Sequence, residues 1–151
     1  MVAATWERVQ IVLTHVGGPH YDETVRLRQR ILRDPLGLVL DTKGDAARTF
    51  FVALEEGRVI GTVALEENRL RAMAVDTQAR GVGRLLVARL EEEARARGLP
   101  RIELHARITA RGFYAKLGYV EEGEIFTEVT IPHIAMGKNI SLLPSTSVRV
   151  T

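Results

Sequence analysis

The order of apolar and polar positions along the chain predicts strands that alternate with helices. Apolar residues at spacings of three and four predict helices at about 23–33, 81–98 and 109–118. Successive strands imply antiparallel hairpins, and a strand–helix–strand order implies a parallel crossover. We therefore expect an α/β fold with a single mixed, mostly antiparallel sheet and helices on both faces. Runs rich in β-branched residues predict strands at 8–16, 49–55, 58–66, 69–75, 101–106 and 131–138.

Turn and capping residues mark the ends of these elements. Asp22 is expected to cap the first helix, and Asp34–Pro35 with Gly37 to end it. Glu56–Gly57 predicts a tight hairpin turn. Asp41 and Asp45 are expected to be exposed in the loop that follows the helix, and attraction of a cationic amine is the alternative. The arginines of this helix are expected on a solvated face, and contact with an acidic substrate is the alternative: Arg26, Arg28, Arg30 and Arg33.

Composition narrows the class of protein. A chain of 151 residues, 46% hydrophobic and 26% charged, is expected to form one domain over 1–151, with no element predicted for the tail 139–151. The absence of cysteine excludes disulfides, thiolate nucleophiles and cysteine-bound zinc, and the four histidines show no metal-ligand spacing. A net charge of +2 does not indicate a nucleic-acid partner. Because the sequence shows no signal peptide and no membrane-spanning apolar run, we expect a cytoplasmic protein. The oligomeric state is left open, with a homodimer paired through the first strand and the tail as one possibility.

The segment VDTQARGVGRLL joins a strand to the long helix and carries two glycines. Gly81 and Gly83 leave backbone N–H groups accessible where a helix begins, and such a helix end attracts anions. Arg80 and Arg84 add positive charge, so a phosphate or pyrophosphate is the expected ligand; a plain tight turn is the alternative. A dinucleotide fingerprint is excluded because Leu86 replaces its third glycine, and the Gly-Lys-Ser/Thr sequence of a phosphate-binding loop is absent.

A short helix with two aromatic residues, TARGFYAKLG, precedes the last strand. Helical spacing places Phe113 with Ala110 and Leu117, and Phe113 is expected in the core. Tyr114 lies beside them, and its hydroxyl needs a hydrogen-bond partner when buried. In a cleft this hydroxyl can donate a proton, so Tyr114 is a candidate general acid.

Three segments, in this order, resemble the GNAT superfamily of acetyl-CoA-dependent N-acetyltransferases. LRAMAV is similar to the family's central strand, QARGVG to the pattern Gln/Arg-x-x-Gly-x-Gly/Ala, and FYAKLGY to the helix that ends in Leu-Gly-Phe/Tyr. The ending GEIFTEVTIPHIAMGK resembles a bacterial subgroup with an Ile-Pro-His segment. The likeness runs from about Arg26 through Lys138. It implies the GNAT fold, an acyltransferase, and acetyl-CoA as the acetyl donor.

The resemblance also implies roles for individual residues. Pantetheine would pair with the backbone of the central strand, a backbone N–H near Ala74 would stabilise the oxyanion, and Tyr114 would protonate the departing thiolate. Arg107 stands where many family members have Asn or Gln, and unlike Asn it cannot accept a hydrogen bond. The residues implied in cofactor binding are Met73, Ala74, Val75, Gln78, Ala79, Arg80, Gly81, Val82, Gly83, Arg84 and Arg107.

The sequence offers several candidates for the general base and does not identify the acceptor. Glu66 and Glu67 end the strand that borders the acceptor side in the family, and a solvated turn is the alternative for both. His105, at a strand end, has an imidazole suited to proton transfer, and His133 is a candidate for the lining of the acceptor pocket. The expected acceptor is a primary amine of a small molecule or peptide, acetylated directly because no cysteine can carry the acetyl group. A non-catalytic acyl-CoA-binding module is the alternative function.

Overall fold

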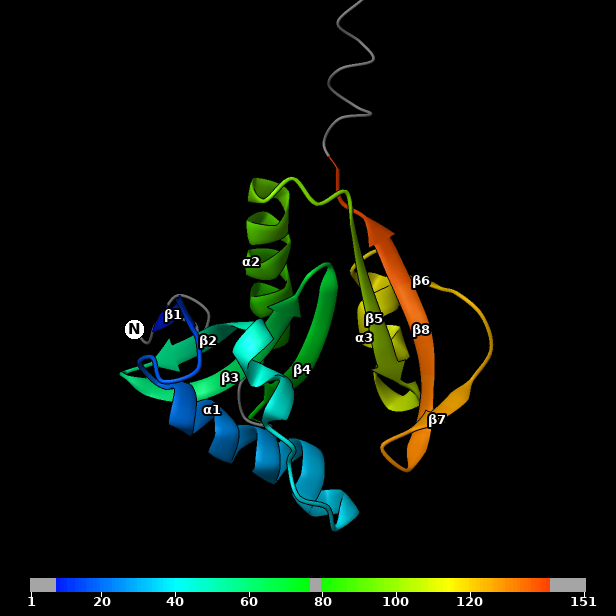
Figure 1. The fold of residues 1–151 in the computed structure, drawn as a ribbon. Coiled ribbons are helices and arrows are strands. Elements are labelled where there is room, and N and C mark those ends of the chain that lie inside the picture. The colour runs from blue at the N-terminus through cyan, green and yellow to red at the C-terminus, as the bar shows by residue number, and fades with distance from the viewer. Residues whose placement is uncertain (1–7, 77–79, 142–151) are drawn as a thin grey trace, which may run out of the picture. The chain divides into compact units, whose positions relative to one another are not determined.

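The computed structural model describes residues 8–76 and 80–141 (Figure 1). The chain forms two compact units, and the division falls after Leu90, inside helix α2 (Val82–Ala96). The expectation of a single domain over 1–151 stays a prediction. The tail from residue 142 onward lies outside the described residues.

The first unit contains four strands that pair antiparallel in chain order. Between β2 and β3, both turn residues have positive φ, 52° at Glu56 and 75° at Gly57, as a type I′ hairpin turn requires. The predicted hairpin is therefore confirmed, and three of the four strands have the predicted bounds. The strands are β1 (Val9–Thr14), β2 (Thr49–Glu55), β3 (Arg58–Glu66) and β4 (Arg69–Val75).

Helices α1 (Tyr21–Arg28) and α2 cover opposite faces of these strands. In β2, the ring of Phe50 contacts Tyr21 of α1 with centroids 5.7 Å apart. The next residue, Phe51, has the guanidinium of Arg89 from α2 5.8 Å from its ring centroid. Neighbouring residues of a strand point to opposite faces, so the two helices lie on opposite sides. Helices on both faces, as predicted, are confirmed for this unit.

Helix α1 begins two residues earlier than expected, and its cap is not the predicted one. The N-cap is His20, with a left-handed backbone at φ 65°, and its carbonyl accepts the first helical hydrogen bond from the N–H of Thr24 at 3.1 Å. The prediction of Asp22 as the cap is wrong, because Asp22 already lies in the first turn. A carboxylate in the first turn still interacts favourably with the positive end of the helix dipole.

The helical path continues beyond α1 with a change of pitch. A π-helical turn follows at Gln29–Arg33, and a 3-10 turn at Asp34–Leu36 contains the proline. Gly37, with φ 69°, then ends the helical path, and its predicted place at the helix end is confirmed. Asp34–Pro35 is therefore part of the last turn, since proline is tolerated at the first positions of a new helical segment.

A buried ion pair corrects two expectations about solvated residues. Arg28 and Asp45, predicted on a solvated face and in an exposed loop, are both 0% exposed. Asp45 lies in the 3-10 turn Lys43–Ala47 and accepts two hydrogen bonds from the Arg28 guanidinium, at 2.8 and 3.3 Å. The hydroxyl of Tyr21 and the guanidinium of Arg48 also donate to Asp45. The pair therefore ties α1 to the segment that leads into β2.

The second unit is built around β8, whose partners are all antiparallel. The predicted strand at 101–106 extends by one residue, and two short strands also pair with β8. A 3-10 turn, Ile108–Ala110, leads directly into the aromatic helix α3. The elements are β5 (Arg101–Arg107), α3 (Arg111–Lys116), β6 (Val120–Glu121), β7 (Phe126–Glu128) and β8 (Ile131–Asn139).

A buried carboxylate connects two elements of this unit with the turn that follows α3. Glu91 of α2 accepts a hydrogen bond from the Tyr119 hydroxyl at 2.8 Å. The ammonium of Lys138, from β8, donates to both oxygens of Glu91 at 3.0 and 3.1 Å. Burial, followed by the charge of Glu91, raises the pKa of Tyr119 far above its ordinary value. The hydroxyl therefore stays protonated and holds the end of α3 against α2.

Candidate active site

Strand β4 carries a bulge at its centre. The pairs Thr62–Ala74 and Ala64–Arg71 enclose a shift of register, and Ala72 between them has φ 56°. A left-handed alanine costs about 1–3 kcal/mol and persists where the surrounding structure holds it. A bulge removes one residue from the ladder and redirects the neighbouring backbone groups. The backbone predicted to hold pantetheine and the acyl oxygen follows directly: Met73, Ala74 and Val75.

The turn before α2 presents open backbone at the start of a long helix. Gly81 has φ 77°, and no atom lies within 4 Å of the position a Cβ would take. Val82, the first residue of α2, is buried and anchors the helix, while Arg80 and Arg84 are exposed beside it. This arrangement suits an anion, because the first N–H groups of a helix have no partner within it. Two residues predicted to bind pyrophosphate lie outside the described residues: Gln78 and Ala79.

Glu66, a candidate base, lies at the end of β3 among arginines. Its Oε1 accepts a hydrogen bond from Nε of Arg48 at 2.9 Å, and Nε of Arg71 is 3.9 Å away. The hydrogen bond from Arg48, with the positive charges around it, lowers the pKa of Glu66 despite some burial. A carboxylate with a lowered pKa is a weaker proton acceptor near neutral pH. Glu67 lies in the exposed turn, with φ 54°.

Tyr114, the candidate acid, is the buried aromatic residue of α3. It is 5% exposed, and its hydroxyl makes no hydrogen bond to any described residue. Burial alone raises its pKa well above the ordinary range, so the hydroxyl stays protonated. The expectation that Phe113 is the core aromatic is wrong: Phe113 is 36% exposed and packs edge-on against Tyr114, with centroids 5.0 Å apart.

Two histidines of the second unit share one carboxylate. Nδ1 of His105 lies 2.8 Å from Oε1 of Glu128, and Nε2 of His133 lies 3.9 Å from Oε2 of Glu128. The ring of Phe126 contacts His105 edge-on at 4.9 Å. Nδ1 of the buried His133 is 2.9 Å from the carbonyl oxygen of Ile131, which can only accept, so this nitrogen carries the proton. A carboxylate therefore orients an imidazole, as in many proton-transfer sites.

The hairpin that brings Glu128 to His133 is strained. Its turn consists of Val129 and Thr130, with φ 50° and 66°. Two-residue turns with positive φ at both positions favour Asn-Gly, and β-branched residues such as Val and Thr rarely adopt positive φ. The strained turn lies next to Glu128 and close in sequence to His133, the two residues that this hairpin brings together.

The sequence reasoning missed Glu128 and Phe126. Their spacing of two before a turn places both on one face of a strand, which is the signal that was available. Arg107 ends β5, is half-buried, and lies opposite His133 in the β5–β8 register.

A family model described as an acetyltransferase (GNAT) domain matches residues 28–140. The chain belongs to the GNAT acetyltransferases. This confirms the predicted family and its class, acyltransferase. Among curated proteins, YyaT of Bacillus subtilis (strain 168), which its name calls uncharacterized, is 44% identical over 61 residues, which are 40% of this chain and 41% of YyaT. The match thus spans about two fifths of the length of that relative.

Solved structures share the fold of this GNAT domain at low sequence identity. An acyl-CoA N-acyltransferase from Pseudomonas aeruginosa has a TM-score of 0.74 and 20% identity, covering 86% of this chain and 99% of that one. An aminoglycoside 6′-N-acetyltransferase complexed with coenzyme A has a TM-score of 0.68 and 19% identity, covering 87% and 97%. The likeness confirms the predicted GNAT fold with its mixed, mostly antiparallel sheet.

Neither a metal centre nor a membrane-spanning helix is found in the ranges 8–76 and 80–141. No group of three or more His, Asp or Glu side chains is arranged there to hold a metal ion. No helix there is long and apolar enough to cross a membrane.

Proposed function

We propose that this GNAT domain transfers the acetyl group of acetyl-CoA directly to a primary amine of a small molecule or peptide. The observation that carries the proposal is the bulge in β4, where left-handed Ala72 turns backbone groups out of the ladder. Membership in the family supports acyl transfer in general. The open turn at Gly81 supports a donor that carries phosphates.

In the proposed reaction, the amine nitrogen attacks the thioester carbonyl, a C–N bond forms and the C–S bond breaks. A backbone N–H near Ala74 stabilises the negative charge that develops on the carbonyl oxygen. The Tyr114 hydroxyl gives its proton to the departing sulfur, and a base takes one proton from the amine. Tyr114 suits this role because it is buried, protonated and without a hydrogen-bond partner among the described residues.

Donor binding is assigned to the first turn of α2 and the strand before it. The N–H groups around Gly81, with Arg80 and Arg84, hold the pyrophosphate, and the β4 backbone pairs with the pantetheine amides. We extend the pyrophosphate site to Gln78 and Ala79 on the family resemblance alone. Arg107 is proposed to contact the donor, where its guanidinium supplies a positive charge in place of an amide.

For the base we propose His105, oriented by Glu128, with Glu66 as the other candidate. The support is electrostatic: arginines lower the pKa of Glu66, whereas His105 has a carboxylate 2.8 Å from Nδ1. The His105→Gln variant should lose the acidic limb of the pH profile of kcat/KM. If the Glu66→Gln variant loses that limb and His105→Gln keeps it, the assignment is reversed.

The reaction is tested by incubating the full chain with acetyl-CoA and a panel of primary amines while free thiol is measured. Thiol release that depends on an amine, with the acetylated amine seen by mass spectrometry, is the expected result. Tight binding of acetyl-CoA with no turnover on any amine would favour the non-catalytic binding module.

The role of Tyr114 is tested by Tyr114→Phe, which removes only the hydroxyl. We expect kcat to fall about a hundredfold or more, with little change in the KM for acetyl-CoA. Tyr119→Phe is the matched control, since that hydroxyl is engaged by Glu91. Equal rates for Tyr114→Phe and wild type across the alkaline range would exclude general-acid catalysis by Tyr114.

A further inference from the structure

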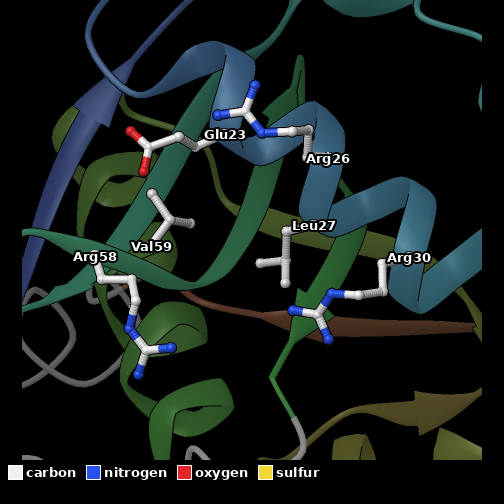
Figure 2. Close-up of a pocket in the computed structure, with 6 residues that line it drawn as sticks. All are labelled: Glu23, Arg26, Leu27, Arg30, Arg58 and Val59. Carbon is white, nitrogen blue, oxygen red and sulfur yellow. The ribbon is translucent and has the colours of Figure 1, made fainter.

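A pocket lies between α1 and the start of β3 in the first unit (Figure 2). Figure 2 shows the apolar side chains of Leu27 and Val59 between the charged residues. None of the lining side chains takes part in the proposed transfer. The lining residues are Glu23, Arg26, Leu27, Arg30, Arg58 and Val59.

The charges around this pocket do not balance. Three guanidinium groups face one carboxylate, so the lining carries a net charge of +2. That carboxylate, Glu23, is already engaged by Nδ1 of His20 at 2.6 Å. Arg26 and Arg58 are exposed, and their side chains form no hydrogen bond or ion pair with any described residue. The lining therefore has unsatisfied donors for an anion.

The third arginine, unlike the other two, has an acidic partner among the described residues. Arg30 belongs to the π-helical turn Gln29–Arg33, and its guanidinium lies 3.4 Å from Oδ2 of Asp76, just after β4. Because π turns are rare and concentrate at functional sites, the distortion marks this end of the helix. Arg30 follows Arg26 by four residues, a spacing that places both on one face of a helix, and both line the pocket.

We propose that this arginine pocket binds a dianionic phosphate group of a small molecule. A guanidinium presents parallel N–H donors that match the oxygens of a phosphate, and a dianion would face the two guanidinium groups that have no ion pair among the described residues, Arg26 and Arg58. Leu27 and Val59 provide an apolar floor for the organic part of the ligand. The phosphate belongs either to CoA itself, whose ribose carries a 3′-phosphate, or to a separate phosphorylated ligand. The first source rests on the proposed function, and the second does not.

The site is tested by titrating the full chain with inorganic phosphate and following binding by 31P NMR. The variant Arg26→Gln/Arg58→Gln removes two exposed arginines of the pocket. Arg97→Gln/Arg111→Gln, a matched control, removes two surface arginines that do not line the pocket, each with an ion pair to a glutamate. We expect saturable binding by wild type and control, and about tenfold or more weaker binding by the pocket variant. Absence of saturable binding by wild type, or equal binding by the two variants, would overturn the proposal.

The source of the phosphate is decided by comparing CoA with dephospho-CoA. If the pocket variant weakens CoA binding but not dephospho-CoA binding, the 3′-phosphate occupies the site. If it weakens phosphate binding alone, a separate ligand occupies the site, and the proposal holds. If neither CoA form binds to wild type, the proposed function fails, while the phosphate titration still tests the pocket.

Discussion

The ion pair between Arg28 and Asp45 allows the sharpest prediction about stability. Asp45→Asn keeps the shape of the side chain but removes the charge that offsets a guanidinium with no exposed surface. The Arg28 guanidinium would keep contact with Thr24 and with the ring of Phe50, whose centroid is 4.6 Å away, but with no anion facing it. Leaving such a charge unpaired costs about 3–5 kcal/mol. This is a large part of the roughly 5–15 kcal/mol by which domains are stable.

A double-mutant cycle separates this pair from its surroundings. Arg28→Met removes the cation but leaves Asp45 with Tyr21 and Arg48, so its cost should be smaller, about 1.5–3 kcal/mol. In the double variant Arg28→Met/Asp45→Asn no charge of the pair is left unpaired. We therefore expect a coupling energy of at least about 1.5 kcal/mol.

The assay is urea unfolding at pH 7, followed by circular dichroism. With a slope near 2 kcal/mol per molar urea, a loss of 4 kcal/mol lowers the midpoint by about 2 M. Asp41→Asn is the control: Asp41 is exposed and only accepts a backbone hydrogen bond from Lys43, so its change should stay within about 0.5 kcal/mol. A loss below about 1 kcal/mol for Asp45→Asn, or strictly additive effects in the cycle, would refute this account of the pair.

Two further predictions concern buried carboxylates. Burial raises the pKa of Asp45, but hydrogen bonds and charges from Arg28 and its neighbours outweigh this and lower it overall. The ionised Asp45 therefore stabilises the protein above its unfolded pKa of about 3.9, and this stabilisation is lost as pH falls through its pKa in the folded state. The difference in unfolding free energy between wild type and Asp45→Asn should shrink below about pH 4. A constant difference down to about pH 2 would contradict this prediction. Glu91→Gln leaves the ammonium of Lys138 without its carboxylate and should lower the free energy of unfolding in urea by about 1–3 kcal/mol. The control Glu93→Gln, which breaks a partly exposed ion pair with Arg97, should lower it by less than about 0.5 kcal/mol. Equal losses would contradict the role of the buried network.

Local pattern was enough to predict most elements of the fold. The strand 69–75 and the hairpin at Glu56–Gly57 have the predicted bounds, because side-chain alternation and turn residues act within a few positions. Gly81 was predicted to leave the backbone open where α2 begins, and no atom lies within 4 Å of the position its Cβ would take. Tyr114 was selected for its chemistry, and the structure shows that it is buried and has no described hydrogen-bond partner.

The sequence alone did not predict which charged and aromatic residues are buried. Arg28 and the exposed Arg26 each follow an apolar residue of α1, so their sequence neighbours do not distinguish them. The ion pair with Asp45, from the 3-10 turn after the helix, makes burial of Arg28 favourable. Phe113 and Tyr114 are neighbours on one short helix, and packing decided which of them is covered.

By itself, the sequence determined the family, the order of the elements and the glycine turn that suits a phosphate-bearing donor, since all of these depend on short-range periodicity and local motifs. The tertiary structure alone decided the bulge at Ala72, the carboxylate shared by His105 and His133, and the arginine pocket between α1 and β3. Each of these depends on strand register or on contacts between residues far apart in the chain. Because register and long-range packing are set by the whole folded unit, no local pattern contains them.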